Sequence, residues 1–124
     1  MIESAKPRKQ RKFRFTAPLH ERQNFVNVHI SKELSSKLGI KRRAIEVRKG
    51  DTVKVMAGDH KGKSGKVLDV NLKTGKIKVD GVVRKNAKAK DLQIPLHASS
   101  VYLTDLDLSD KLRKADLEGQ KQKK

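Results

Sequence analysis

Hydrophobic and polar residues alternate through the middle of the chain, between residues 45 and 108. The alternation is clearest at residues 52–57, 68–72 and 76–80, and a further run of this kind stands at residues 101–104. A spacing of two is typical of strands that bury one face. Several short strands within about 60 residues predict a mostly β domain, either a small β-barrel or two crossed sheets.

Glycines mark the turns between these predicted strands. Lys73, Thr74 and Gly75 separate the second run from the third and predict a short hairpin loop with the glycine in the left-handed position. Gly81 permits a bend before Val82. We therefore expect consecutive strands to pair through tight turns.

The spacing becomes helical before this region. A short helix is predicted from Leu19 to Val26, two apolar residues seven apart that would share one face. A second is better defined, because Ser31 is a good N-cap and Gly39 a good stop. Neither is long enough to be stable in isolation, so both must lie on a protein or RNA surface.

The C-terminal end predicts one more helix, with Ser109 as its N-cap and a polar, frayed tail from Gly119 to Lys124. The chain then divides into three parts. Residues 1–44 form a basic N-terminal extension with two short helices, residues 45–108 the β domain, and residues 109–124 a helix and tail.

Composition indicates the class of partner. The 124 residues include 31 Lys and Arg against 14 Asp and Glu, a formal net charge of +17, which favours a polyanion such as nucleic acid. The absence of cysteine excludes disulfide scaffolds, zinc fingers, iron–sulfur sites and thiol catalysis. No apolar run suits a membrane helix, and the basic N-terminus leads into no apolar stretch, so we expect neither membrane insertion nor a secretory signal.

The charge is unevenly distributed along the chain. Residues 1–50 carry 14 basic and 4 acidic groups, and residues 51–90 carry 11 and 4. Residues 91–124 carry six of each and are neutral. The whole excess lies in the first ninety residues, which predicts a binding face that continues into an arm.

The arm is the stretch of residues 6–15, with six cations in the nine positions from Lys6 to Arg14. Self-repulsion and a shortage of apolar residues should keep it from folding alone. Phe13 and Phe15 flank Arg14 and have two interpretations. The rings stack on unpaired RNA bases, or they dock on the protein's own β domain while the cations are solvated. A nuclear localisation signal would have the same composition.

The loop at residues 58–66 carries three glycines and four basic side chains, counting His60. Gly62, Lys63 and Ser64 resemble the end of a phosphate-binding loop, but Ala57 stands where that motif has its first glycine. The motif also requires a following helix, whereas strand-like residues follow here. A hairpin loop that approaches phosphates and ribose oxygens is the better interpretation, with a solvated turn as the alternative.

Residues 49–67 resemble a KOW motif, the strand–loop–strand element of RNA-associated SH3-like barrels. The flanking residues 17–22, 29–34 and 101–104 are similar to the universal large-subunit ribosomal protein family L-twenty-four, called L-twenty-six in eukaryotes, and the likeness covers residues 6–112. The extensions resemble the archaeal and eukaryotic branch, and the compact tail the archaeal one. The resemblance implies a small SH3-like barrel within a mostly β fold.

The resemblance also implies a function. Members of the family are structural, non-enzymatic proteins of the cytoplasmic ribosome that bind the 5′ region of large-subunit rRNA, act early in assembly and lie near the polypeptide exit tunnel. The expected partners are therefore large-subunit rRNA and neighbouring ribosomal proteins, with no small-molecule substrate, cofactor or homo-oligomer. The alternative is a KOW-type transcription or translation factor that binds RNA or protein, because such factors carry the motif too.

The resemblance carries rRNA contact over to the glycine loop and the arm, and charge adds the other cations. The predicted rRNA-binding residues are Lys6, Arg8, Lys9, Arg11, Lys12, Phe13, Arg14, Phe15, His20, Arg22, Lys32, Lys41, Arg42, Arg43, Lys49, Gly58, His60, Lys61, Gly62, Lys63, Gly65 and Lys66. Family members often have an aromatic residue where His60 stands, so base stacking is less expected there.

Other candidate chemistries are weaker. The four histidines, at positions 20, 29, 60 and 97, lack metal-ligand spacing, so no metal site is expected. Asp105, Asp107 and Asp110 alternate with leucines, which predicts a solvated strand face rather than paired catalytic carboxylates. That face would keep this end off RNA or meet a basic neighbour.

Overall fold

The computed structural model describes residues 3–122 and contains one mixed seven-stranded sheet with several short helices. The α-helices are α1 (Pro7–Thr16), α2 (Leu19–Gln23), α3 (Lys32–Leu38) and α4 (Lys111–Gln122). The strands are β1 (Asn27–Ile30), β2 (Ala44–Glu46), β3 (Thr52–Val55), β4 (Ser64–Asn71), β5 (Lys76–Lys85), β6 (Asp91–His97) and β7 (Val101–Asp105). Short 3₁₀ turns stand at Asn24–Val26 and Ala98–Ser100.

The strand order is β2-β1-β7-β3-β4-β5-β6, with β1 and β7 parallel and the other neighbours antiparallel. Strand β7 has both edges occupied, by β1 and β3, which leaves β6 and β2 at the two edges of the sheet. The sheet is therefore open, and the predicted barrel is not confirmed. The predictions of mostly β structure and of tight hairpins are confirmed, the loop at Gly75 having a φ of 68°.

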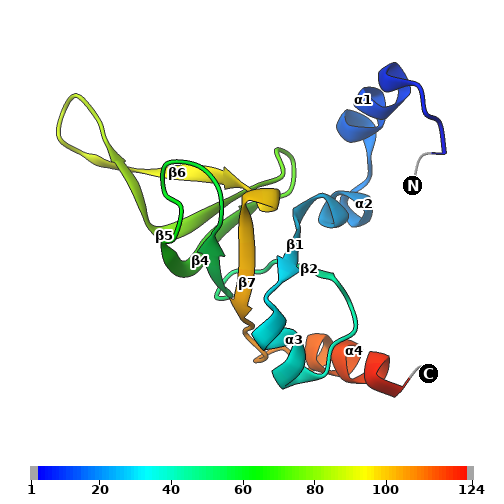
Figure 1. Cartoon of the computed structure of the whole chain (residues 1–124). Coiled ribbons are helices and arrows are strands. Elements are labelled where there is room, and N and C mark those ends of the chain that lie inside the picture. The colour runs from blue at the N-terminus through cyan, green and yellow to red at the C-terminus, as the bar shows by residue number, and fades with distance from the viewer. Residues whose placement is uncertain (1–2, 123–124) are drawn as a thin grey trace.

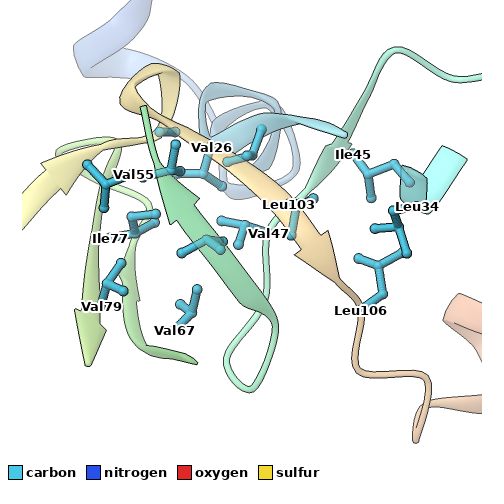
Figure 2. Close-up of a cluster of buried hydrophobic side chains, with 14 of the residues drawn as sticks. Val26, Leu34, Ile45, Val47, Val55, Val67, Ile77, Val79, Leu103 and Leu106 are labelled. Atoms are coloured by element: carbon cyan, nitrogen blue, oxygen red, sulfur yellow. The ribbon is translucent and has the colours of Figure 1, made fainter. Parts of the chain in front are cut away.

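The core follows the alternation in the sequence. Val53 and Val55 on β3 are buried while Lys54 between them is exposed, and the same holds on β5 and β7. Figure 2 shows the buried side chains running from Ile77 on β5 to Leu34 on α3, so one core joins the sheet to the helices below it. Burying such side chains is the main stabilising contribution to a domain of this size.

Local signals place α3 as predicted. The Ser31 hydroxyl accepts from the Leu34 backbone N–H at 3.2 Å, and Gly39 takes the left-handed conformation at the C-cap. The prediction for residues 19–26 is only partly right, because α2 ends at Gln23 and a 3₁₀ turn follows. The change of period separates the faces of the two apolar residues: Val26 is buried, whereas Leu19 is 65% exposed.

The C-terminal helix forms one residue later than predicted. The Asp110 carboxylate, not Ser109, accepts from the first turn, at 2.9 Å from the Leu112 N–H. Asp110 is the better cap because a carboxylate also interacts favourably with the helix dipole. Helix α4 continues through Gln122, and the last two residues of the predicted tail lie outside the described residues.

Figure 1 shows how these elements are arranged. Helices α1 and α2 lie at one end of the molecule, and α3 and α4 lie close together at another. The hairpin of β5 and β6 projects away from the sheet. Three different surfaces are thereby available for partners. No helix among the described residues is long and apolar enough to cross a membrane.

Candidate nucleic-acid interface

The glycine loop, residues 56–63, joins β3 to β4 and has a defined backbone. The Gly62 N–H donates to the Val55 carbonyl and the Val55 N–H to the Lys63 carbonyl, both at 2.8 Å. Gly58 and Gly62 have φ near 92° and 91°, and a Cβ at either would meet nothing within 4 Å. Positive φ and open space explain glycine at both positions. The loop is an exposed hairpin with room for a partner's backbone.

The basic side chains of this loop face outward. Lys61, Lys63 and Lys66 are exposed, and His60 is half-buried. Strand β4 follows directly at Ser64, so the loop lacks the helix N-terminus that a phosphate-binding loop requires. Nucleotide hydrolysis through that motif therefore has no structural basis here.

Gly65 has a different role from the loop glycines. A Cβ on Gly65 would lie 2.3 Å from the backbone oxygen of Asp80, so β5 crosses β4 too closely for any side chain. Packing within the sheet explains this glycine without a ligand. Lys49 is also engaged, because its Nζ lies 2.9 Å from Asp69 Oδ1. The hydrogen bond from Lys49 lowers the pKa of the Asp69 carboxyl.

Residues 7–16 of the arm form helix α1, which was not predicted. Pro7 occupies the first turn, and the lysines and arginines that follow are good helix formers. The helix buries none of its residues. Lys6 at its N-cap and the five cations within it, Arg8, Lys9, Arg11, Lys12 and Arg14, are all exposed.

The two rings of the arm have different environments. Phe13 packs edge-on against Phe25, with ring centroids 6.1 Å apart, and the Arg14 guanidinium lies 5.7 Å from the centre of the same ring. Phe15 is 80% exposed. Of the two interpretations, docking on the protein's own structure describes Phe13, and only Phe15 is free to stack on a base.

Arg22 holds the end of α1. Its Nε donates to the Ala17 carbonyl at 2.8 Å, and a terminal nitrogen donates to the Phe15 carbonyl at 2.7 Å. These bonds satisfy carbonyls that have no partner within the helix. Arg22 therefore has a structural role, while the neighbouring His20 on α2 is exposed.

A second group of predicted cations lies around α3. A groove of about 420 Å³ is lined by Lys32, Lys41, Arg42 and Arg43 together with Ser35, Ser36 and Ile30. Arg42 also approaches Asp116 of α4, with 3.5 Å between Nη1 and Oδ2. The fold thus brings these four cations together although the sequence separates Lys32 from the others.

Comparison with known proteins shows the family. Residues 4–120 match the family model of the ribosomal proteins that are called L26 in eukaryotes and, in archaea, by the number twenty-four. The chain belongs to this ribosomal protein family.

Similar proteins cover almost the whole chain. It is 48% identical to the large ribosomal subunit protein uL24 of Saccharolobus solfataricus over 95% of its length and 98% of the relative's. It is 45% identical to that of Pyrobaculum islandicum and 48% to that of Methanocella arvoryzae, each over 95% of this chain and 94% of the relative. These archaeal relatives agree with the expected branch of the family.

In this member of the family, one basic surface was missed by the sequence predictions. Arg84, Lys85, Lys88 and Lys90 lie at the end of the projecting β5–β6 hairpin, and all are exposed. Figure 1 shows the hairpin extending from the sheet. Four cations within seven positions were a usable signal, but without the projection of the hairpin nothing distinguished them from a solvated turn.

The neutral C-terminal end of this ribosomal protein is organised by a buried ion pair. Asp51 is fully buried and Arg113 is 6% exposed, and their groups meet in two hydrogen bonds, at 2.6 and 2.8 Å. Neither residue was predicted to have a role. The signal was absent because the two lie 62 positions apart.

The acidic residues near this end do not line a strand face as predicted. Strand β7 ends at Asp105, and both Asp107 and Asp110 lie in the segment that leads to α4. Asp110 meets a basic neighbour, since its Oδ2 lies 2.5 Å from Arg48 Nη1. The Leu112 N–H and then Arg48 lower the pKa of the Asp110 carboxyl, and the Ser109 backbone N–H and hydroxyl lower that of Asp107. No group of three metal-ligating side chains was found within the described part of the chain.

Proposed function

We propose that this protein is a structural component of the large ribosomal subunit that binds the 5′ region of large-subunit rRNA and supports early assembly near the exit tunnel. Neighbouring ribosomal proteins are its other partners. Family membership and the names of the archaeal relatives support this proposal. We also infer that β3, β4 and their neighbours correspond to the SH3-like barrel of KOW proteins, and that the divisions near residues 44 and 108 are domain limits.

One structural observation carries the proposal: α1 exposes all its cations and buries no residue. Arg8 and Lys12 are four positions apart, and Arg11 and Arg14 are three apart, so like charges are neighbours on the helix surface. Such pairs destabilise an isolated helix by about 0.2–0.5 kcal/mol each. A polyanion removes this repulsion, and rRNA phosphates provide one.

The mechanism is electrostatic. Helix α1, the glycine loop, the α3 groove and the β5–β6 hairpin present cations on separate parts of the surface. Each can neutralise the phosphates of a different rRNA segment, so one protein would hold several segments together. The buried Asp51–Arg113 pair and the neutral end leave a further side for protein neighbours.

The test is binding of the full chain to deproteinised archaeal large-subunit rRNA, with small-subunit rRNA as competitor. With about 6–10 phosphate contacts, affinity should fall about 10³–10⁵-fold between about 50 and 200 mM salt. The double variant Arg8→Gln/Lys12→Gln should lower the slope of log affinity against log salt by about 2. Lys111→Gln/Lys114→Gln on α4 removes the same charge and should leave the slope unchanged.

Two outcomes would contradict the proposal. A flat salt dependence, or equal affinity for both rRNAs, would remove the support for a specific large-subunit component. Unchanged rRNA affinity in the α1 variant, together with binding to a transcription or translation protein, would favour the alternative of a KOW-type factor.

A further inference from the structure

A groove of about 400 Å³ separates α1 from the hairpin loop between β4 and β5. Arg11, Arg14 and Phe15 line it from α1, and Lys73, Thr74 and Gly75 line it from the loop, with Phe25 between them. The two sides come from segments almost sixty positions apart. Its volume is within the range of about 300–1,000 Å³ typical of small-molecule sites.

The helical side of this groove, here called the α1 groove, is held in place by three contacts. Phe13 packs edge-on against Phe25, Arg14 lies over the Phe25 ring, and Arg22 binds the carbonyls at the end of the helix. Together they fix both the position of α1 and its rotation. Phe15 is therefore presented at the groove by a defined element.

The loop side is equally well defined. The Asn71 side-chain oxygen accepts from the backbone N–H groups of Lys73 and Thr74, at 3.0 and 3.1 Å. The Gly75 N–H donates to the Asn71 carbonyl at 2.9 Å. A loop with these bonds keeps its shape, so both walls of the groove are formed before any partner binds.

The chemistry of the lining is specific. Phe15 is 80% exposed although it is a large aromatic residue, so its ring is open to a partner. Three cations surround the two rings, and no acidic residue is among the lining residues that the structure describes. A flat apolar face beside several cations matches a base attached to phosphates, and base stacking on an aromatic ring is tolerant of sequence.

We propose that the α1 groove binds one unpaired nucleotide of an RNA strand. The base stacks on Phe15, and Arg11, Arg14 and Lys73 neutralise the phosphates on either side of it. This inference rests on the proposed function and refines it, because it assigns the groove to a single-stranded position such as a loop or a bulge. A base paired within a duplex is already stacked and does not reach the ring.

The experiment measures binding of the full-length protein to three probes: a single-stranded oligouridylate, an RNA duplex of the same length, and oligoglutamate. Phe15→Ala should weaken binding of the single strand about 5- to 150-fold, the usual range for loss of one base–aromatic stack. Duplex binding should not change. The salt slope should also be unchanged, because no charge is removed.

Three further variants sharpen the test. Phe15→Trp should restore single-strand binding, whereas Phe15→Leu, apolar but not planar, should not. Lys73→Gln should lower the salt slope by about 1 for the single strand. Leu112→Ala is the matched control, since Leu112 is a large apolar residue on α4 that is 81% exposed. Circular dichroism checks that each variant keeps its fold.

The outcomes are distinguishable from those for the proposed function. If Phe15→Ala binds the single strand as the wild type does while rRNA binding persists, the nucleotide site is overturned and the proposed function stands. If oligoglutamate shows the same dependence on Phe15, the groove is a protein-binding site and this inference is wrong. If the wild-type protein binds no RNA, both proposals fail.

Discussion

Arg113 of α4 and Asp51 before β3 form a buried, two-point ion pair that joins the ends of the folded chain. Both carboxylate oxygens accept from the guanidinium, and each also accepts a backbone N–H, from Arg48 at 2.8 Å and from Asp107 at 2.9 Å. The guanidinium donates in turn to the carbonyls of Asp107 and Glu46. Such complete hydrogen bonding is what allows charges to remain buried.

Removing one partner of this pair should strongly destabilise the protein. We expect Arg113→Met or Asp51→Ala to lower the free energy of unfolding by about 3–5 kcal/mol, because a charge is left buried without its partner. Denaturant unfolding followed by circular dichroism measures this. Arg48→Gln, which breaks a solvent-screened pair with Asp110, should have a clearly smaller effect. Equal losses in the Arg48 and Arg113 variants would contradict the role given to burial.

The glycines of the KOW-like segment should respond differently to the same substitution. Gly65→Ala places a Cβ 2.3 Å from the Asp80 oxygen and should cost about 1–3 kcal/mol or more of stability as β4 and β5 separate. Gly58→Ala meets only open space and loses stability through its positive φ alone, about 1 kcal/mol. Thermal unfolding compares the two. A Gly65 variant as stable as wild type would show that the strands can separate freely.

Local signals in the sequence predicted the elements that depend on neighbours along the chain. The Ser31 cap and the Gly39 stop limit α3 as expected, and alternation placed β3, β5 and β7. Helix α1 was missed because its cations repel one another, while the contact that orients it, Phe13 with Phe25, is tertiary. Strand β6 was missed because it is exposed along much of its length and shows little alternation.

The candidate site was predicted in its charge but not in its geometry. Charge density alone selected the arm and the loop, and their cations are exposed as expected. Arg22 and Gly65 were assigned to RNA by proximity to those cations, yet hydrogen bonds at the end of α1 and strand packing explain them. The converse error left out Lys73, because a hairpin residue becomes part of a groove only when another element faces it.

Acid should weaken the attachment of α4. The Leu112 N–H and then Arg48 hold the pKa of Asp110 below its ordinary value, so this carboxylate stabilises the folded state above the unfolded pKa of about 3.9. That contribution is lost as pH falls through the lower, folded pKa. Asp110→Asn keeps an oxygen for Leu112 but loses the charge that faces Arg48. We expect the variant to be less stable than wild type at pH 7 and the difference to disappear below about pH 4. Urea unfolding at both pH values measures it, and a difference that grows as pH falls would contradict the assignment.

The tip of the β5–β6 hairpin should contribute to RNA binding without contributing to stability. Lys85 and Lys88 are exposed, and Figure 1 shows the hairpin projecting from the sheet, so their charges have little effect on the core. Lys85→Gln/Lys88→Gln should lower the salt slope of rRNA binding by up to about 2. Its unfolding free energy should match that of Lys111→Gln/Lys114→Gln, which removes equal charge from α4. A slope equal to wild type would show that the hairpin does not contact phosphates and would restrict the RNA-binding surface to α1, the α3 groove and the glycine loop.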